Sequence, residues 1–262
     1  MSNLPIVKNF EHSNILIEKI TWHKVSATKE NIINKKFNIE SNIFCLYSSN
    51  SIENFYKVVL LSNKKNLFLK IIDINKLPNI EFSNDIAKYL YKNKINTSLI
   101  KKKIIDKNNK LVFVLYDFIE GNYLKINNRN LFNLGKYIAN FHKVLQNYKF
   151  KKLIKKNSFK KIKQFNQILN KNNYKKLTND RNLIKILKNP DNKKYINILE
   201  KNQQIIHGDL NFKNILVNKK NKIFILDFED MEYSFHNPLF DLSTIIERFI
   251  LIRSNKKKFQ LI

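Results

Sequence analysis

The 262-residue sequence has little cysteine and little glycine, with one Cys and three Gly. Its single cysteine, Cys45, cannot form a disulfide within the chain, so a reducing compartment fits better than secretion. No window approaches the roughly 18 uncharged apolar residues of a membrane-spanning helix. Residues 1–14 also lack the basic and apolar regions of a signal peptide. We therefore expect a cytoplasmic chain without a membrane span.

Acidic residues are also scarce, since 21 Asp and Glu stand against 49 Lys and Arg, for a net charge of +28. Such an excess is typical of nucleic-acid-binding proteins. Here it consists mainly of Lys, is spread over both halves of the chain and accompanies abundant Asn and Ile, which favours a solvated basic surface. We expect no nucleic-acid partner. The hydrophobic content of 43% excludes wholesale disorder.

The first half of the sequence is predicted to form an antiparallel sheet with one helix. Strands are expected in five segments rich in β-branched and aromatic residues: 37–47, 55–61, 67–72, 97–105 and 111–118. Residues 81–92 carry apolar side chains at the spacing of one helical face. This order of elements predicts an α+β lobe. Residues 1–36 are weakly patterned, and either an extra strand and helix or a flexible arm is compatible with them.

The second half of the sequence is predicted to be mainly helical. Apolar residues at helical spacing predict a helix over 130–148, and two or three more are expected within the Lys- and Asn-rich stretch 151–202. The chain then changes to short apolar segments joined by turns, followed by a helix over 239–252. We therefore divide the chain into an N-terminal lobe, 1–118, and a C-terminal helical lobe, 119–262.

One stretch, 205–229, contains a distinctive set of polar residues. The triplet His207, Gly208 and Asp209 follows an apolar pair, and Asn214 comes five residues after Asp209 at the start of a short apolar segment. Asp227 comes thirteen residues later, at the end of a second apolar segment. A turn between the two segments predicts a hairpin that brings Asn214 and Asp227 close together, with Asp209 on the preceding loop.

These residue types suit phosphoryl transfer from a nucleotide. That reaction needs one carboxylate to orient the acceptor hydroxyl and hard oxygen ligands to hold Mg2+ against the phosphates. Asp209 suits the first role, and Asn214 with Asp227 suits the second. The alternative interpretation is that Asp209 is a turn residue or helix cap and that the other two are polar ends of a hairpin.

The pattern His-Gly-Asp-Leu-x-x-x-Asn, followed by Asp-Phe-Glu, resembles the signature of the aminoglycoside phosphotransferase/choline kinase superfamily, the small-molecule relatives of protein kinases. Glu229, the third residue of Asp-Phe-Glu, distinguishes the small-molecule pattern from the usual Asp-Phe-Gly of protein kinases. The resemblance covers roughly residues 37–252. It implies a two-lobed, protein-kinase-like α+β fold that binds ATP or GTP with Mg2+ and phosphorylates a hydroxyl of a small molecule.

The same resemblance implies roles for residues of the first half. Lys70 is expected to contact the nucleotide phosphates and to pair with a helix acid. Both Glu81 and Asp85 are candidates for that acid, and Glu81 is preferred for its longer side chain. The segment Asp117, Phe118 and Ile119 is expected to line the adenine pocket as the hinge.

Further matches imply supporting roles in the second half. Asp241, in Pro-Leu-Phe-Asp-Leu, is expected to brace the catalytic loop. His142 and His207 are expected to be structural.

The sequence departs from the family pattern in two places, the first at the expected phosphate loop and the second at the expected acceptor pocket. The glycine-bearing loop between the first strands is absent, and Glu40, Ser41 and Asn42 are expected in its place. The sequence ends about twenty residues after Asp241, whereas relatives carry more C-terminal helices that shape the acceptor pocket. The basic helical half favours a neutral or anionic acceptor. A catalytically silent nucleotide-binding protein and a basic nucleic-acid-binding protein are the alternative functions.

Overall fold

The computed structural model describes residues 22–46, 55–170 and 201–247. Two compact units are distinguished within it. The sheet unit comprises described residues up to 137 together with 212–229, and the helical unit comprises 138–170, 201–211 and 230–247. These two units do not test the lobe division expected after residue 118, which stays a prediction.

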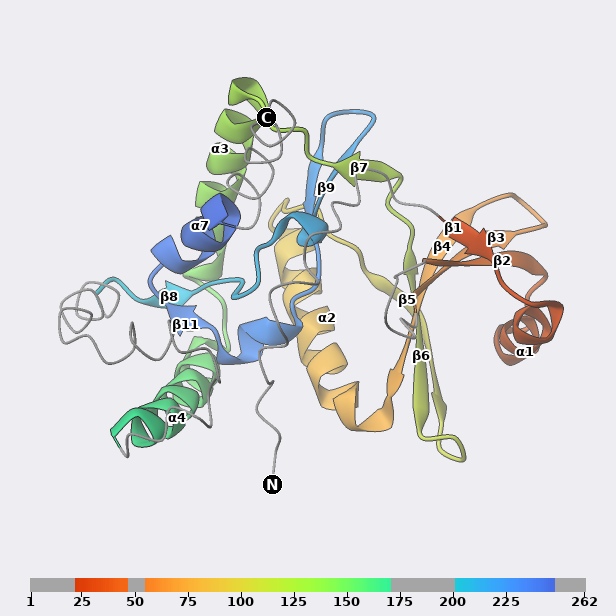
Figure 1. Cartoon of the computed structure of the whole chain (residues 1–262), viewed down its shortest axis with the longest axis horizontal. Coiled ribbons are helices and arrows are strands. Elements are labelled where there is room, and N and C mark those ends of the chain that lie inside the picture. Colours follow the sequence, from red (N-terminus) through yellow and green to blue (C-terminus); the bar gives the residue numbers. More distant parts are fainter. Residues whose placement is uncertain (1–21, 47–54, 171–200, 248–262) are drawn as a thin grey trace, which may run out of the picture. The chain divides into compact units, whose positions relative to one another are not determined.

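The sheet unit is built on a six-stranded antiparallel sheet with strand order β1-β2-β3-β4-β6-β5 (Figure 1). The strands are β1 Trp22–Lys24, β2 Ser41–Leu46, β3 Phe55–Leu60, β4 Asn66–Asp73, β5 Ile100–Asp106 and β6 Leu111–Asp117. The structure therefore has a strand within each of the five segments predicted from composition. Residue 47, at the end of the first, lies outside the described residues.

The segment before β2 contains a helix, α1 (Ala27–Phe37), and β1 precedes it. For residues 22–36, the structure thus selects the extra strand and helix over the flexible arm. The predicted strand start at residue 37 was wrong, because Phe37 is the last residue of α1 and is buried against the sheet. Asn38 ends the helix in the left-handed conformation, with φ of 53°, which Asn tolerates better than most residues.

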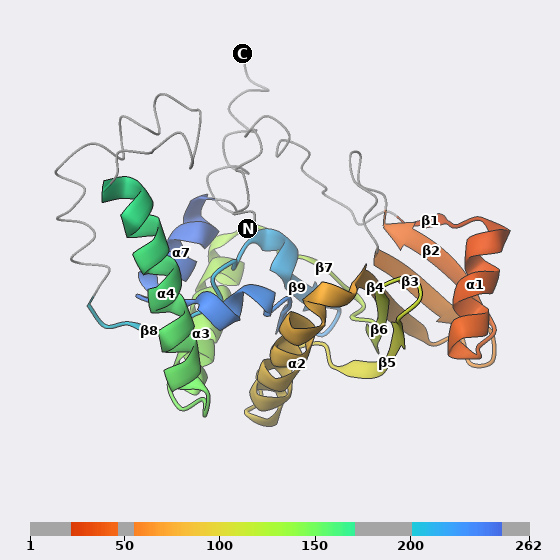
Figure 2. The same cartoon turned by 90° about the horizontal axis from the view of Figure 1, so that it is seen from below.

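Two helices cover opposite faces of the sheet (Figure 2). On one face, Ile33 and Phe37 of α1 pack in a cluster that includes Leu67 and Leu69 of β4. On the other face, Ile80 of α2 (Leu77–Lys92) packs against Ile72 of β4 and neighbouring residues of β6. Because side chains alternate along a strand, Lys70 lies on the same face as Ile72, away from α1.

A second, three-stranded sheet in the same unit has the order β10-β9-β7. It consists of β7 Gly121–Tyr123, β9 Ile215–Asn218 and β10 Ile223–Ile225. The antiparallel pair β9–β10 confirms the hairpin predicted from the sequence. Gly121 permits close pairing here, because a Cβ at this position would lie 2.9 Å from the Val217 carbonyl oxygen.

The helical unit contains α4 Lys151–Asn170, α7 Leu239–Ile245 and the short pair β8 Gln204–Ile205 and β11 Phe235–His236. The helix α3, Asn128–Leu145, begins in the sheet unit and ends in the helical unit, and it confirms the helix predicted near 130–148. Residues 171–200 and 248–252, where further helical structure was predicted, lie outside the described residues. Among the described helices, none is long and apolar enough to cross a membrane.

Candidate active site

Lys70 lies at the centre of a charged cluster in the sheet unit. Its ammonium group forms an ion pair with the Glu229 carboxylate and lies 3.8 Å from Oδ1 of Asp227. The Lys70 side chain is only 14% exposed. Strand alternation directs it to the face opposite α1, and the residues that follow β10 carry the two acids to it. The result is a cation next to two carboxylates. The ammonium group can contact phosphate oxygens, and the carboxylates can coordinate a metal ion.

Tyr116, on β6, belongs to the surroundings of the same cluster. Burial raises the pKa of its phenol well above the ordinary value, and the negative charges of Glu229 and Asp227 raise it further. Tyr116 therefore stays neutral across the physiological pH range. The sequence analysis missed this residue, because an alternating strand position reveals burial but not the acids that arrive from a distant segment.

The β9–β10 hairpin brings Asn214 and Asp227 to the same end of the hairpin. Ile215 pairs with Ile225, and the Leu226 amide donates to the Asn214 carbonyl oxygen at 3.0 Å. Asp227 follows immediately, with φ of 64°. A left-handed conformation is unfavourable for most side chains but tolerated by Asp and Asn. The backbone therefore aims the Asp227 carboxylate in a direction that an extended strand would not provide.

The donor types at this end of the hairpin fit Mg2+. Asn214 is almost fully buried, and the Asp227 side chain is 47% exposed. An amide oxygen and a carboxylate are hard ligands, and Mg2+ usually keeps several waters and substrate phosphates in its shell instead of an all-protein cage. Within the described residues, no group of three or more His, Cys, Asp or Glu residues could hold a metal by itself. A site completed by phosphate oxygens is consistent with that small donor set.

The hairpin is held in place by Asn96, from the segment between α2 and β5. Its side-chain amide donates to the Ile223 carbonyl oxygen at 2.9 Å, and its own carbonyl accepts from the Ile225 amide at 3.1 Å. The Tyr137 hydroxyl accepts from the Asn96 amide at 2.6 Å. Asn96 therefore joins β10 to α3, a positioning role that no sequence spacing revealed.

In the helical unit, the loop around Asp209 is organised by the buried carboxylate of Asp241. It accepts hydrogen bonds from the backbone amides of His207 at 2.8 Å and Gly208 at 2.9 Å, and it lies 2.8 Å from Nε2 of His142. Burial alone would raise the pKa of Asp241. The His142 hydrogen bond, the charge of both histidines and the His207 amide outweigh burial and lower it. Asp241 is thus an ionised group that fixes the loop backbone.

Gly208 is required at its position by space as well as by conformation. Its φ is +85°, and an added Cβ would lie 2.0 Å from the Ser234 hydroxyl oxygen. The Ser234 hydroxyl is itself held by a 2.7 Å hydrogen bond to the Asp230 carbonyl oxygen. The loop therefore passes so close to Ser234 that only glycine fits.

We expect Asp241→Asn to lower the free energy of unfolding at pH 7 by at least about 2 kcal/mol, because buried donors lose a charged acceptor. The native pKa of Asp241 is depressed, so its contribution is complete above the unfolded pKa of about 4 and is lost as pH falls through the lower native value. Urea denaturation of both proteins between pH 7 and pH 3 measures this. The difference should narrow below pH 4, and a pH-independent difference would contradict the ionised state of Asp241.

Asp209 is held on this loop by its neighbours. Its carboxylate accepts from the Asn211 side-chain amide at 2.8 Å, and its backbone amide donates to Nδ1 of His207 at 3.3 Å. His207 is fully buried. Asp209 lies in the helical unit and Asn214 and Asp227 in the sheet unit, so their joint action stays a prediction.

Comparison with known proteins gives a family for this chain. A model described as the phosphotransferase enzyme family matches residues 49–254. The chain belongs to this family. None of the curated proteins is similar enough to the sequence to count as a relative.

Several solved structures have a fold similar to that of this chain. An aminoglycoside-3'-phosphotransferase of type VIII has a TM-score of 0.55 at 10% identity, over 84% of this chain and 82% of its own. APH(2")-IIia, solved with GDP and kanamycin, has a TM-score of 0.54 at 14% identity, over 87% and 81%. A thermostable APH(4)-Ia mutant, solved with ADP and hygromycin B, has a TM-score of 0.52 at 8% identity, over 89% and 82%. The predicted protein-kinase-like α+β fold and the superfamily resemblance are thus confirmed.

The expected helix partner of Lys70 forms an ion pair with a different residue. Glu81 forms an ion pair with Lys103 at 2.5 Å, whereas Lys70 contacts Glu229 and Asp227. The structure does not bring Glu81 to Lys70, and no bond joins Asp85 to Lys70 among the described residues. A role for Glu81 in nucleotide binding stays a prediction.

The expected hinge occupies the end of β6 and the connection to β7. The Asp117 carboxylate lies 2.9 Å from the Lys101 ammonium, and its carbonyl oxygen accepts from the Ser98 hydroxyl at 2.9 Å. Phe118 and Ile119 are partly buried and follow directly. Their adenine contacts stay a prediction.

The expected replacement for the glycine-bearing loop was placed wrongly. Ser41 and Asn42 belong to β2, and Ser41 is tied to α1 because its hydroxyl donates to Oδ1 of Asn34 at 2.6 Å. The strand before the lysine strand, β3, is joined to β2 by residues 47–54, which lie outside the described residues.

Proposed function

We propose that this phosphotransferase moves the γ-phosphate of ATP or GTP to a hydroxyl of a small molecule, with Mg2+ bound to the nucleotide. The observation that supports this most directly is the cluster of Lys70, Asp227 and Glu229 on the face of the sheet away from α1. Asn214 lies at the same end of the hairpin as Asp227. A nucleoside triphosphate with its metal ion requires a cation for the phosphates and oxygen ligands for the metal, and these residues supply both.

Each residue of this proposal has a defined task. The Lys70 ammonium binds α- and β-phosphate oxygens, exchanging part of its contact with Glu229 for phosphate. Asn214 and Asp227 supply the oxygen ligands that hold Mg2+, which neutralises charge on the phosphates when bound. The Asp209 carboxylate accepts a hydrogen bond from the acceptor hydroxyl and orients its oxygen for in-line attack.

The loop contacts support the role of Asp209. The Asp241 carboxylate accepts hydrogen bonds from the backbone amides of His207 and Gly208, which restrains the chain before Asp209. The Asn211 amide donates to one oxygen of the Asp209 carboxylate and so restrains the orientation of that carboxylate. A group held in this way loses little conformational freedom when the substrate binds, which lowers the barrier to reaction.

The acceptor is proposed to be a small alcohol that carries neutral or anionic groups. The similar structures include proteins solved with kanamycin or hygromycin B, which makes an aminoglycoside the first compound to test. A polycationic ligand needs acidic surroundings, however, and this chain has 49 basic against 21 acidic residues. Sugars, amino alcohols and nucleosides are therefore also candidates.

A transfer screen tests the proposal. The protein is incubated with Mg2+ and γ-labelled ATP or GTP and separate pools of aminoglycosides, choline, homoserine, sugars and nucleosides. We expect label in an organic product from one pool, and none when Mg2+ is chelated. Saturable Mg2+-dependent binding of ATP and GTP without transfer to any pool would instead indicate a silent nucleotide-binding protein.

A further inference from the structure

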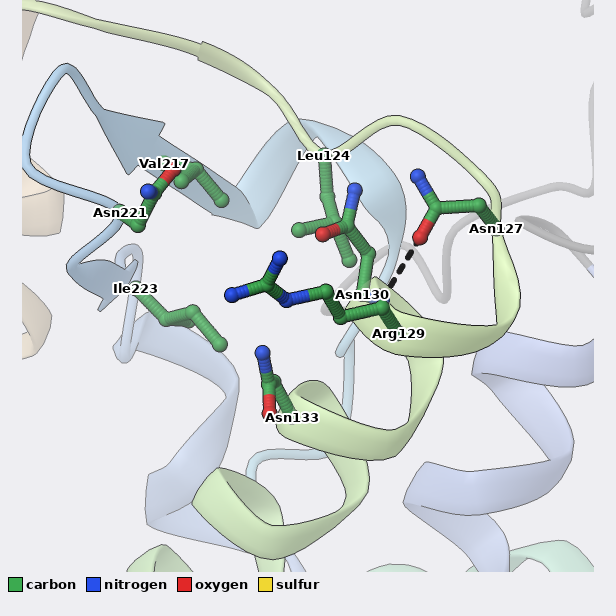
Figure 3. Close-up of a pocket in the computed structure, with 8 residues that line it drawn as sticks. All are labelled: Leu124, Asn127, Arg129, Asn130, Asn133, Val217, Asn221 and Ile223. Carbon is green, nitrogen blue, oxygen red and sulfur yellow. Dashed lines mark hydrogen bonds between the residues drawn. The ribbon is translucent and has the colours of Figure 1, made fainter.

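A separate cavity of the sheet unit lies between the first turn of α3 and the β9–β10 hairpin (Figure 3). Its volume is 280 Å³, near the lower end of the range for small-molecule sites. The lining residues are Leu124, Asn127, Arg129, Asn130, Asn133, Val217, Asn221 and Ile223. None of the residues named above for phosphoryl transfer is among them.

Arg129 is the central polar residue of this cavity. It is the one arginine within the described ranges of a chain whose basic residues are mostly lysine. Figure 3 shows its guanidinium extending from α3 toward the hairpin, into the space between Ile223 and Asn130. No lining residue is acidic, and none of the ion pairs in the described part of the chain involves Arg129. The counter-charge that a planar guanidinium fork matches best is a carboxylate or phosphate.

The other lining groups suit an anion with an organic body. In Figure 3 the side-chain amide of Asn133 lies next to the guanidinium, and Asn221 lies beside Val217 on the hairpin; both amides can donate further hydrogen bonds. Leu124, Val217 and Ile223 supply an apolar wall. Ligand pockets typically combine such apolar walls with a few converging polar groups.

The helix start strengthens the attraction for negative charge. Asn127 caps α3, because its side-chain oxygen accepts from the Asn130 amide at 2.8 Å (dashed in Figure 3). Arg129 lies in the first turn, where the helix dipole places partial positive charge. The dipole therefore adds to the guanidinium charge at the same place.

We propose that this cavity binds a small organic anion, with its carboxylate or phosphate group held by Arg129 and its apolar part against Val217 and Ile223. Such a ligand bridges α3 and the β9–β10 hairpin. The proposal does not depend on the phosphotransferase activity, since it uses none of the groups assigned to that reaction.

Titration of the isotope-labelled full chain with acetate, butyrate and inorganic phosphate, followed by NMR, tests the proposal. The signals to follow are Nε of Arg129 and the side-chain amides of Asn133 and Asn221. We expect saturable shifts of these signals, with butyrate binding more tightly than acetate because of the apolar wall. Comparing the dissociation constants of phosphate and butyrate shows whether the cavity prefers a phosphate or a carboxylate group.

Three variants separate specific binding from general attraction to a basic surface. Arg129→Gln should weaken binding at least about tenfold, and Arg129→Lys should weaken it by a smaller factor, because lysine keeps the charge without the fork. Lys136→Gln, which removes one positive charge elsewhere on α3, should leave the dissociation constant unchanged. Shifts that never saturate, or an equal loss in Arg129→Gln and Lys136→Gln, would overturn the proposal.

Discussion

Replacement of Asp209 by Asn is expected to lower kcat by a factor of about 10²–10⁴ while nucleotide affinity stays nearly unchanged. The Asn side chain has the same shape and can still accept from the Asn211 amide, as Asp209 does at 2.8 Å. It cannot orient and accept a proton from the acceptor hydroxyl as a carboxylate does. Steady-state kinetics with the acceptor found in the transfer screen, together with calorimetric nucleotide titration, measure both quantities.

The matched control for this variant is Asn211→Ala. It removes the hydrogen bond to the Asp209 carboxylate and leaves the carboxylate itself, so the expected loss in kcat is no more than about tenfold. Full activity in Asp209→Asn would show that the base has been assigned to the wrong residue. A similar loss in both variants would show that the loop conformation matters and not the carboxylate.

Replacement of Asp227 by Asn is expected to abolish the Mg2+ dependence of nucleotide binding. Asn tolerates the left-handed conformation that Asp227 adopts, with φ of 64°, so the backbone is preserved. The carboxylate that would neutralise the metal is lost, and Mg2+ binds poorly to an uncharged amide pair. Isothermal titration with ATP or GTP, with and without Mg2+, measures the effect.

Asp230→Asn provides the control for the loss of one negative charge near Asp227 in the sequence. Asp230 is exposed, and its described hydrogen bond uses the backbone carbonyl, which accepts from Ser234. We therefore expect Mg2+-dependent binding to be retained. Unchanged Mg2+-dependent binding in Asp227→Asn would contradict the metal role of Asp227.

Much of the sheet could be predicted because its strands have a strong local signal. Residues 55–61 and 67–72 are rich in β-branched and aromatic side chains, and the structure has β3 and β4 there. The start of β2 could not be predicted in this way. Phe is a residue type that favours strands, but Phe37 is the last residue of α1, because the apolar helix face that it shares with Ile33 packs on the sheet. Tertiary packing of that kind overrides local preference.

The candidate site was predictable where its residues are close in sequence. The turn between two short apolar segments is enough to place Asn214 near Asp227, and the structure has them at one end of the β9–β10 hairpin. The partner of Lys70 was not predictable in this way. Glu229 is 159 residues away in the sequence, and nothing in local spacing favours it over Glu81, which the structure pairs with Lys103.

The most direct test of the central claim is the fate of the γ-phosphate, followed by phosphorus NMR of the wild-type chain with Mg2+, nucleotide and an acceptor pool. The proposed function predicts a new phosphomonoester signal that grows as the γ-phosphate signal of ATP or GTP falls, and that grows far more slowly with Asp209→Asn. Transfer to a small-molecule hydroxyl would be contradicted if the γ-phosphate signal persisted with every pool. It would also be contradicted if the γ-phosphate were released only as inorganic phosphate.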